Sequence, residues 1–475
     1  MNSNYELIKD NIIYMNQDWD SYEIVDLSEM PNPNDLRDYC TKRKAYVSKH
    51  LKTNIENDFQ LVIPNVIESK LANLHQLTFE VTDMCNLKCK YCAFGELYGD
   101  YDERANNLLK ISDVKLLLDY LIDLWNSDLN KSHGSGIYIS FYGGEPLVNF
   151  NFIEETVEYI ASKNLYHNHI IFSMTTNAVL LKKHIQYLVN NNFRLLVSLD
   201  GDKKNNSYRI FQDGSESFSL IINNLDYVRD KYPLFFENNI NFNSVLHDMN
   251  SVEETFNYIR NRFNKFTRIS ELNPSGLKKN QISTFNKMYK SQRKSLLESK
   301  NAEYIKKKMS ANLAEVMNLF IFLSRYSGNI YQDYNELLLN DEYELFETPS
   351  GTCYPFSKKM YVTVTGKILP CEKISHRFAL GHVDSNCLSL DFDGISKMYN
   401  NYYNSLISKC KMCSNLKTCT LCIFNLDTID SNPLICPRFK NKKNLGIDLN
   451  NHIKYLSNNV SMYRKLVNEI VLQID

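Results

Sequence analysis

The hydrophobic pattern between residues 77 and 272 alternates between two kinds of segment. Short apolar runs rich in β-branched and aromatic residues are followed by longer stretches in which apolar residues recur at helical spacing. The runs predict strands at 77–82, 136–142, 170–174, 193–199, 240–246 and 266–272, and the stretches between them predict helices at 112–125, 151–163, 181–191, 217–231 and 251–263. This alternation is typical of an α/β fold with a parallel sheet and crossover helices.

Serines mark the beginning of two predicted helices. Ser112 and Ser251 each stand where a serine side chain can accept a hydrogen bond from a free backbone N–H group. Ser251 is followed three residues later by Glu254, which is the spacing of a capping box. We therefore expect both serines to cap their helices.

The chain divides by composition into five regions. The α/β pattern fills one of them, a polar and then helical stretch follows it, and cysteines become frequent after that. The predicted boundaries are 1–70 for an N-terminal segment, 75–274 for the α/β domain, 275–345 for a helical bridge, 346–440 for a cysteine-rich domain and 441–475 for a polar tail.

The two terminal regions carry their own predicted elements. Apolar runs at 5–15 and 22–27 predict a hairpin around a polar turn, and a helix is predicted from Asn34 or Asp35 to about Leu51. In the polar tail, one amphipathic helix is predicted at 459–473.

Three cysteines, Cys85, Cys89 and Cys92, follow the first predicted strand on a single loop. In α/β folds, chemistry collects at the carboxyl ends of the strands. Three thiolates leave one iron of a four-iron cluster without a protein ligand, so a small molecule can chelate that iron. A structural zinc site is the alternative, but it needs a fourth ligand, and the nearest histidines are His75 and His133.

The spacing Cys-x3-Cys-x2-Cys, with Tyr91 before the last cysteine, resembles that of the radical S-adenosylmethionine (radical SAM) superfamily. The segment Tyr142-Gly143-Gly144-Glu145-Pro146 after the second strand adds to this resemblance. It implies a partial (β/α)6 TIM-like barrel, a [4Fe–4S] cluster on the three cysteines, and S-adenosyl-L-methionine (SAM) bound to that cluster. Electron transfer from the cluster to SAM would then give a 5′-deoxyadenosyl radical that abstracts a hydrogen atom.

The same resemblance implies SAM contacts at the ends of three strands. The candidate residues are Gly143, Gly144, Glu145 and Pro146 after the second strand, Thr176 and Asn177 after the third, and Ser198 and Asp200 after the fourth. The Gly-Gly-Glu-Pro segment contacts the amino group of SAM in the family, and the other residues would line its ribose and the substrate. Asn, Asp and Gly are also common in strand-end turns, so a purely structural role is the alternative.

A second set of cysteines lies in residues 353–436. Its members are Cys353, Cys371, Cys410, Cys413, Cys419, Cys422 and Cys436, with Gly366 between the first two. This pattern resembles the SPASM domain, a C-terminal module that binds two auxiliary [4Fe–4S] clusters. The resemblance assigns an outer cluster to Cys410, Cys413, Cys419 and Cys436, and an inner cluster to Cys353, Cys371 and Cys422.

The inner cluster is the less complete of the two assignments. Two residues separate Cys419 from Cys422 where the family has three, which leaves the role of Cys422 open. Either Cys387 or an iron open to substrate would complete the inner cluster, and zinc is the alternative metal for the whole set. SPASM sulfatase maturases have an acid next to a cluster ligand that acts as a base. Glu372 holds that position beside Cys371 and is the candidate catalytic residue, with a surface carboxylate as the alternative.

Composition excludes several classes of function. The net charge is −1 over 475 residues, so there is no basic field for nucleic acid. There is no apolar run long enough to span a bilayer and no apolar signal stretch at the N-terminus. We therefore expect a cytoplasmic protein with no membrane partner. Twelve cysteines in such a protein favour metal binding over disulfides.

The resemblance implies a radical SAM peptide maturase that places a thioether or carbon–carbon crosslink in a ribosomally synthesised precursor peptide. Residues 209–215, together with Ser217 and Phe218, resemble this group. The expected partners are the precursor peptide and a one-electron reductant, flavodoxin or ferredoxin. Residues 1–70 would dock the peptide by strand addition or cap the barrel. An anaerobic sulfatase-maturing enzyme that forms formylglycine is the alternative enzyme, and a non-catalytic metal-binding scaffold or peptide carrier is the alternative outside enzymes.

Overall fold

The computed structural model describes the backbone of residues 4–8, 11–15 and 22–26, and residues 59, 61–309, 348–416, 419–426, 428–431, 434–441, 443–444 and 447. The helices predicted near residues 34–51 and at 459–473 lie outside this described part. No helix within the described part is long and apolar enough to cross a membrane.

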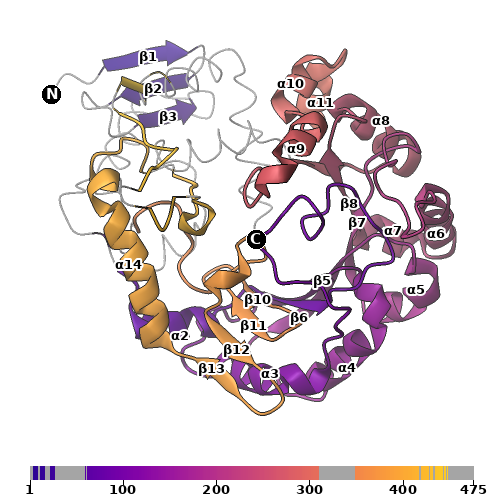
Figure 1. Ribbon diagram of the computed structural model, residues 1–475, viewed down its shortest axis with the longest axis horizontal. Coiled ribbons are helices and arrows are strands. Elements are labelled where there is room, and N and C mark those ends of the chain that lie inside the picture. Colours follow the sequence, from indigo (N-terminus) through magenta and orange to yellow (C-terminus); the bar gives the residue numbers. More distant parts are fainter. Residues whose placement is uncertain are drawn as a thin grey trace.

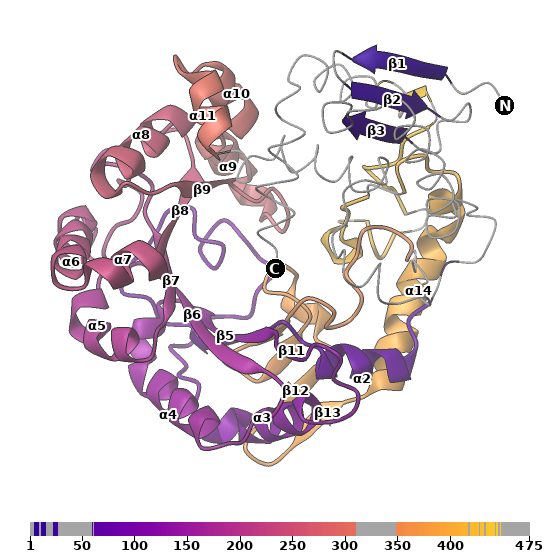
Figure 2. The same ribbon diagram turned by 180° about the vertical axis from the view of Figure 1, so that it is seen from behind.

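Six parallel strands form the centre of the fold. They are β4 (Gln76–Thr82), β5 (Gly136–Gly143), β6 (His169–Thr176), β7 (Arg194–Ser198), β8 (Ile240–Leu246) and β9 (Thr267–Glu271). Each pairs in parallel with the next along the chain. The α/β class and the order of the predicted strands are therefore confirmed. Figures 1 and 2 show these strands curving into an open barrel with helices around its outer side.

The crossover helices also agree with the hydrophobic pattern. They are α3 (Ile111–Trp125), α4 (Phe150–Ala161), α5 (Leu181–Asn190), α6 (Phe218–Lys231), α7 (Pro233–Asn239) and α8 (Val252–Phe263), of which α7 was not predicted. Ser251 caps α8, because its Oγ accepts a hydrogen bond from the backbone N–H of Glu254 at 3.2 Å. The prediction for Ser112 is wrong, because α3 already begins at Ile111 and Lys110 is its N-cap.

The strand β4 shows why one end of this barrel can hold a polar site. Its apolar residues Leu77, Phe79 and Val81 belong to the main core cluster that the helices complete. Side chains alternate between the two faces of a strand, so Thr78 and Glu80 point to the opposite face, inside the barrel, and both are buried. On β4 the inner face of the barrel is therefore polar and closed to solvent.

The sheet continues beyond the barrel in a way that the sequence did not predict. The short strand β10 (Met360–Val362) pairs in parallel with β4, and β11 (Lys367–Leu369), β12 (Gly381–Val383) and β13 (Leu388–Leu390) follow as an antiparallel extension. All ten strands form one sheet in the order β13-β12-β11-β10-β4-β5-β6-β7-β8-β9. The cysteine-rich region is thus joined directly to the first barrel strand.

Two helices fasten this extension to the barrel. The long helix α14 (Phe392–Lys411) lies beside α2 (Pro64–Ala72), as Figure 2 shows. The Asn400 side chain exchanges hydrogen bonds with the backbone of Val62 just before α2, at 2.7 and 3.0 Å. The segment before the barrel and the segment after it therefore pack together.

The remaining described elements lie at the two ends of the barrel sequence. After β9, the helices α9 (Ile282–Met288), α10 (Gln292–Leu297) and α11 (Ala302–Met309) form the described part of the predicted helical bridge. Near the N-terminus, β1 (Asn4–Ile8), β2 (Asn11–Met15) and β3 (Tyr22–Asp26) form a separate antiparallel sheet. The first strand predicted there is therefore two strands, and only its second half pairs with β3.

Candidate functional site

The loop after β4, here called the cysteine loop (residues 83–110), carries Cys85, Cys89 and Cys92 at the carboxyl end of the barrel. All three side chains are half-buried. The pKa of Cys85 and that of Cys89 are raised to about 12, mainly by burial and in part by the negative charges of the neighbouring thiolates. The three thiols are therefore close neighbours, and their thiolate forms need a nearby positive charge.

The two glycines of the Gly-Gly-Glu-Pro segment are required by this loop. A Cβ atom on Gly144 would lie 1.9 Å from the carbonyl oxygen of Met84, and Gly143 has a φ of +125°, where L side chains are rare. The backbone N–H of Gly144 donates to Thr82 O at 2.8 Å, and that of Glu145 donates to Met84 O at 2.9 Å. The end of β5 thus lies directly against the residues that precede Cys85.

The Glu145 side chain connects the end of β5 to the end of β6. It accepts hydrogen bonds from the Thr176 hydroxyl at 2.6 Å and from the Asn177 backbone N–H at 2.7 Å. Burial raises the pKa of Glu145 to about 7, although these donors act in the opposite direction. A cationic group next to this carboxylate would favour its ionised form. Pro146 follows at the start of a short 3-10 turn, Pro146–Asn149.

Asn177 joins β6 to the cysteine loop. Its Nδ2 donates to Asn86 Oδ1 at 2.7 Å and lies 3.8 Å from the sulfur of Cys85, which also receives the Leu87 backbone N–H at 3.4 Å. Within the described part of the chain, Asn86 Nδ2 is buried without a hydrogen-bond partner. A free donor beside a thiolate suits a site that holds a further acceptor, such as the sulfur atoms of a cluster.

The structure gives Asp200 a different environment from the ribose contact that its motif implied. Asp200 is fully buried, and its carboxylate forms a two-point ion pair with Arg209 at 3.0 and 3.1 Å. It also accepts the hydroxyl of Tyr91 and, at 2.8 Å, the backbone N–H of Val245. Burial alone would raise the pKa of Asp200, but the charges and hydrogen bonds of Arg209 and His247 lower it to about 2. Ser198, by contrast, ends β7 half-buried.

The far arm of the cysteine loop contacts both the barrel and the β10–β13 extension. The carboxylate of Asp83 accepts the backbone N–H groups of Ala105 and Asn107, which folds the arm back on the strand end. Asp102 forms ion pairs with Lys367 at 2.6 Å and with His376 at 3.2 Å. The cysteine loop is therefore held from both sides.

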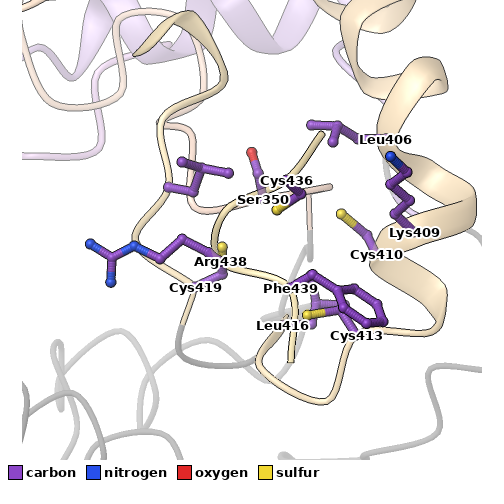
Figure 3. Close-up of a pocket in the computed structure, with 11 residues that line it drawn as sticks. Ser350, Leu406, Lys409, Cys410, Cys413, Leu416, Cys419, Cys436, Arg438 and Phe439 are labelled. Carbon is purple, nitrogen blue, oxygen red and sulfur yellow. The ribbon is translucent and has the colours of Figure 1, made fainter. Parts of the chain in front are cut away.

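The four cysteines predicted for an outer cluster line one pocket. Figure 3 shows Cys410, Cys413, Cys419 and Cys436 on its walls, with apolar side chains such as Leu406 completing them. Cys410 comes from the last turn of α14, and the other three come from the loops that follow it. The pKa of Cys410 is raised to about 11, mainly by burial and in part by the charges of the other three thiolates.

The three cysteines predicted for an inner cluster lie near a buried tyrosine. The pKa of Tyr399 is raised first by burial, then by Tyr403, and then by the charges of Cys422, Cys353 and Cys371. The Tyr399 hydroxyl is buried and has no hydrogen-bond partner among the described residues. Cys387 lies instead in the exposed turn before the edge strand β13.

Glu372 lies between the two cysteine regions. Its carboxylate pairs with Lys359 at 3.1 and 3.2 Å, and although burial acts to raise the pKa of Glu372, the Lys359 charge brings it below its ordinary value. The pKa of Tyr142 is raised by burial and then by the charges of Glu372 and Cys92. The Tyr142 hydroxyl therefore lies near both groups.

The donor sets fit iron–sulfur clusters in their chemistry. Both regions offer several thiols in partly buried surroundings, and each holds a buried polar atom that lacks a partner among the described residues, Asn86 Nδ2 in one and Tyr399 Oη in the other. Within the described residues, no three His, Cys, Asp or Glu side chains are arranged to hold a single metal ion.

Comparison with known proteins agrees with the barrel and its loop. The model of the radical SAM superfamily matches residues 79–259. The radical SAM cyclopropyl synthase TigE of Paramaledivibacter caminithermalis is 30% identical over 210 residues, which is 41% of each chain. A cysteine-type anaerobic sulfatase-maturating enzyme of Clostridium novyi is 25% identical over 158 residues, 33% of this chain and 40% of the relative. The matches thus span less than half the length of these relatives.

Solved structures extend the agreement in fold beyond the matched residues. Native anSMEcpe with bound AdoMet superposes with a TM-score of 0.56 at 17% identity, over 83% of this chain and 99% of that one. The same protein with AdoMet and the Kp18Cys peptide gives a TM-score of 0.53 at 18% identity, over 76% and 92%. The match over residues 79–259 identifies a radical SAM domain in that part of the chain, and the solved structures show that its fold is shared.

Proposed function

We propose that this chain is a radical SAM enzyme that modifies a peptide or protein. In this proposal Cys85, Cys89 and Cys92 hold a [4Fe–4S] cluster to which SAM binds. When bound, the cluster supplies the electron for reductive cleavage of SAM, which gives a 5′-deoxyadenosyl radical. The observation that carries the proposal is the packing of the Gly-Gly-Glu-Pro backbone against the start of the cysteine loop, at the polar end of the barrel.

The residues around the loop would position SAM and the cluster. Asn177 donates toward the sulfur of Cys85, and hydrogen bonds to ligand sulfurs are one way in which a protein sets cluster potential. Glu145 holds the ends of β5 and β6 together beside this point. We propose that Gly143, Gly144, Thr176 and Ser198, which stand at or next to strand ends, contact SAM. Asp200 is better suited to support the loop than to touch the ribose.

Two auxiliary [4Fe–4S] clusters form the second part of the proposal. Cys410, Cys413, Cys419 and Cys436 would hold the outer one, because all four line one pocket. Cys353, Cys371 and Cys422 would hold the inner one near Tyr399, with its last iron open. The position of Cys387 on an edge turn favours the open iron. Burial of such sites tunes cluster potentials, so these clusters could pass electrons to or from the barrel.

Glu372 is our candidate for the group that removes a proton from the substrate. It is held ionised by Lys359 and lies near Tyr142, between the cysteine loop and Cys371. An ionised carboxylate can accept a proton, whereas a neutral one cannot. The electron that starts each turnover would come from flavodoxin or ferredoxin, which fits a protein that acts in the cytoplasm.

A peptide substrate is supported by what similar proteins bind or make. The solved structure with the Kp18Cys peptide shares this fold, and the TigE relative is named for a ring-forming reaction. We propose that the product is a thioether or carbon–carbon crosslink in a ribosomally made peptide, and that residues 1–70 assist docking. Formylglycine formation in a sulfatase is the second candidate, because the Clostridium novyi relative carries that name.

Anaerobic incubation with SAM and dithionite tests the reaction class. The wild-type chain should form 5′-deoxyadenosine and methionine, and Cys85→Ala should form neither. A scaffold or carrier would give no 5′-deoxyadenosine from the wild-type chain. To separate the two substrate classes, the same reaction is run with the product of any short open reading frame found beside this gene and with a sulfatase-derived peptide. Mass spectrometry should show a loss of two hydrogens only in the former.

A further inference from the structure

A buried cluster of polar and charged side chains lies under the cysteine loop, and of its members only Asp200 has been given a role so far. Its members are Tyr91, Asp200, Arg209 and His247, of which Asp200 and His247 are fully buried and the other two are 7% exposed. They come from the cysteine loop, the end of β7, the connection after β7 and the end of β8. Separate parts of the barrel therefore meet at one point beneath the loop.

The connection after β7 also holds the loop along its backbone. Lys88 N–H donates to Ile210 O at 2.7 Å and Lys90 N–H to Tyr208 O at 3.1 Å, so the two segments lie beside each other like strands. The Gln212 side chain donates to Cys85 O at 2.9 Å. We call residues 208–212 the strap, because they run along the loop from Cys85 to Lys90.

Arg209 is the strap residue that turns inward. Its guanidinium pairs with both oxygens of Asp200 and lies over the ring of Tyr91, with its central carbon 5.4 Å from the ring centroid. The Tyr91 hydroxyl donates to the same carboxylate. Since Tyr91 stands between Cys89 and Cys92, this three-way contact fixes the middle of the cysteine triple.

The guanidinium also supplies charge to the loop. The Arg209 guanidinium lies over the ring of Tyr91, which stands between Cys89 and Cys92, so a buried positive charge lies next to this part of the loop. The paired carboxylate of Asp200 brings a negative charge to the same place. In buried surroundings such charges are poorly screened, so removing either one changes the local potential more than it would at the surface.

We propose that Arg209 is a positioning residue of the cysteine loop, which orders the loop through Tyr91 and places a positive charge beside Cys89 that Asp200 partly balances. This inference rests on the proposed function, because it takes Cys85, Cys89 and Cys92 as the cluster ligands. According to this inference, the Asp200–Arg209 pair influences both the assembly of that cluster and its reduction potential.

Two neutral variants, Arg209→Gln and Asp200→Asn, test the charge. The readout is a redox titration of reconstituted protein, following the electron paramagnetic resonance signal that changes when SAM is added. Reduction adds negative charge, so Arg209→Gln should disfavour it and Asp200→Asn should favour it. We expect shifts in opposite directions, each about tenfold in the one-electron equilibrium constant, which corresponds to about 59 mV. Shifts in the same direction, or none in folded protein, would overturn the proposal.

Arg209→Lys tests the positioning and keeps the charge. A lysine cannot hold both oxygens of Asp200 and cover Tyr91, so we expect the SAM-responsive signal per chain to fall by about threefold or more while its potential stays the same. An undiminished signal would refute the positioning role. If the neutral variants do not fold, Arg209→Lys alone tests whether Arg209 positions the cysteine loop.

Arg262→Gln is the matched control, because it breaks the Arg262–Asp226 ion pair on the outer helices, away from the loop. It should leave both signal and potential unchanged. If the wild-type chain itself shows no SAM-responsive signal and forms no 5′-deoxyadenosine, the proposed function fails and this inference falls with it. A normal wild-type chain with unaltered variants would overturn only the inference.

Discussion

The cysteine loop and the cysteine-rich region after residue 348 both bring thiols together, but through different interactions. On the loop, Cys85, Cys89 and Cys92 are neighbours in sequence, and backbone hydrogen bonds from β5 and the strap fix their surroundings. In the C-terminal region the cysteines come from segments as distant as Cys353 and Cys436, and the elements between them must first fold. Sequence spacing therefore brings the first three thiols together and tertiary contacts position them, whereas the second site needs tertiary structure even to bring its cysteines together.

The buried polar groups differ only in degree between the two regions, since Asn86 Nδ2 on the loop also lacks a hydrogen-bond partner among the described residues. Around the loop, the carboxylates of Asp83, Glu145 and Asp200 each accept two or more hydrogen bonds. Near the inner cysteines, the Tyr399 hydroxyl has no partner within the described part of the chain. The loop is thus largely preorganised by protein contacts, whereas the C-terminal sites depend more on the groups they would bind.

Replacing one cysteine in each region should show the largest difference. Cys85→Ala removes a proposed ligand of the SAM-binding cluster, so 5′-deoxyadenosine formation should fall to the level of a protein-free reaction. Cys410→Ala removes an outer ligand, so SAM cleavage without peptide should persist, on the order of a tenth of wild type or more, while peptide modification is lost. Both products are measured by liquid chromatography and mass spectrometry. Full SAM cleavage by Cys85→Ala would contradict the comparison.

The glycine that contacts the loop offers the next largest effect. In Gly144→Ala the new Cβ would meet the backbone oxygen of Met84, so the loop must move, and we expect a loss of about 3 kcal/mol in unfolding free energy together with loss of the SAM-responsive cluster signal. Gly99→Ala is the control on the same loop, because its nearest neighbour is Lys278 Cγ at 3.4 Å. Chemical denaturation should separate the two variants. Equal unfolding free energies of the two variants would show that the loop can move away from the new Cβ atom at little cost.

The sequence predicted the barrel well because its signals are local. Six strands and five of the crossover helices follow from periodicity, and the cysteine triple and Gly-Gly-Glu-Pro stand at strand ends where the fold places them. The pairing of β10 with β4 was missed, because β10 has only three residues and its partner lies almost 300 residues earlier. Such a pairing has no signal in the hydrophobic pattern of either strand.

The support of the site was harder to predict than the site itself. Asp200 was assigned to the ribose of SAM because its motif stands at a strand end, but the structure pairs it with Arg209. The eight residues between them loop back, and nothing in their spacing shows which carboxylate the arginine meets. A buried ion pair of this kind can be identified only once the positions of the loops are known. An arginine soon after an Asp-Gly turn is nevertheless a sequence feature that could have suggested it.

The raised pKa of Glu145 predicts that the unfolding free energy depends on pH through a group at the end of the barrel. Burial lifts its pKa from 4.5 to about 7, so between these values the folded chain binds more protons than the unfolded chain, and stability falls as pH rises. Glu145→Gln removes this dependence. Urea unfolding at pH 5 and pH 8 should show a decline that is up to about 3 kcal/mol steeper in the wild type. Glu80 has a similar pKa but is present in both proteins, so its effect cancels.

An equal fall in unfolding free energy from pH 5 to pH 8 in wild type and variant would show that Glu145 is ionised over this whole range. The end of the barrel would then be more hydrated than the burial of Glu145 implies. At pH 5 the variant should be the less stable protein. Its amide cannot accept hydrogen bonds at both positions where Thr176 and Asn177 donate, so one donor is left without an acceptor.

The smallest effect compares an ion pair of each region. Lys359 and Glu372 are both partly covered, with 26% and 19% of their side chains exposed, whereas Lys163 and Asp119 on the outer barrel helices are more open at 33% and 40%. Water screens the outer pair, so Lys163→Met should change the unfolding free energy less than Lys359→Met, for which we expect a loss of about 1–2 kcal/mol. The reason lies in Glu372, which would be left half-covered without its partner and beside Cys371. Urea unfolding of the two variants makes the comparison directly. If Lys163→Met has the larger effect, side-chain pairing matters less in the C-terminal region than on the barrel, and the division between the two regions would have to rest on the cysteines alone.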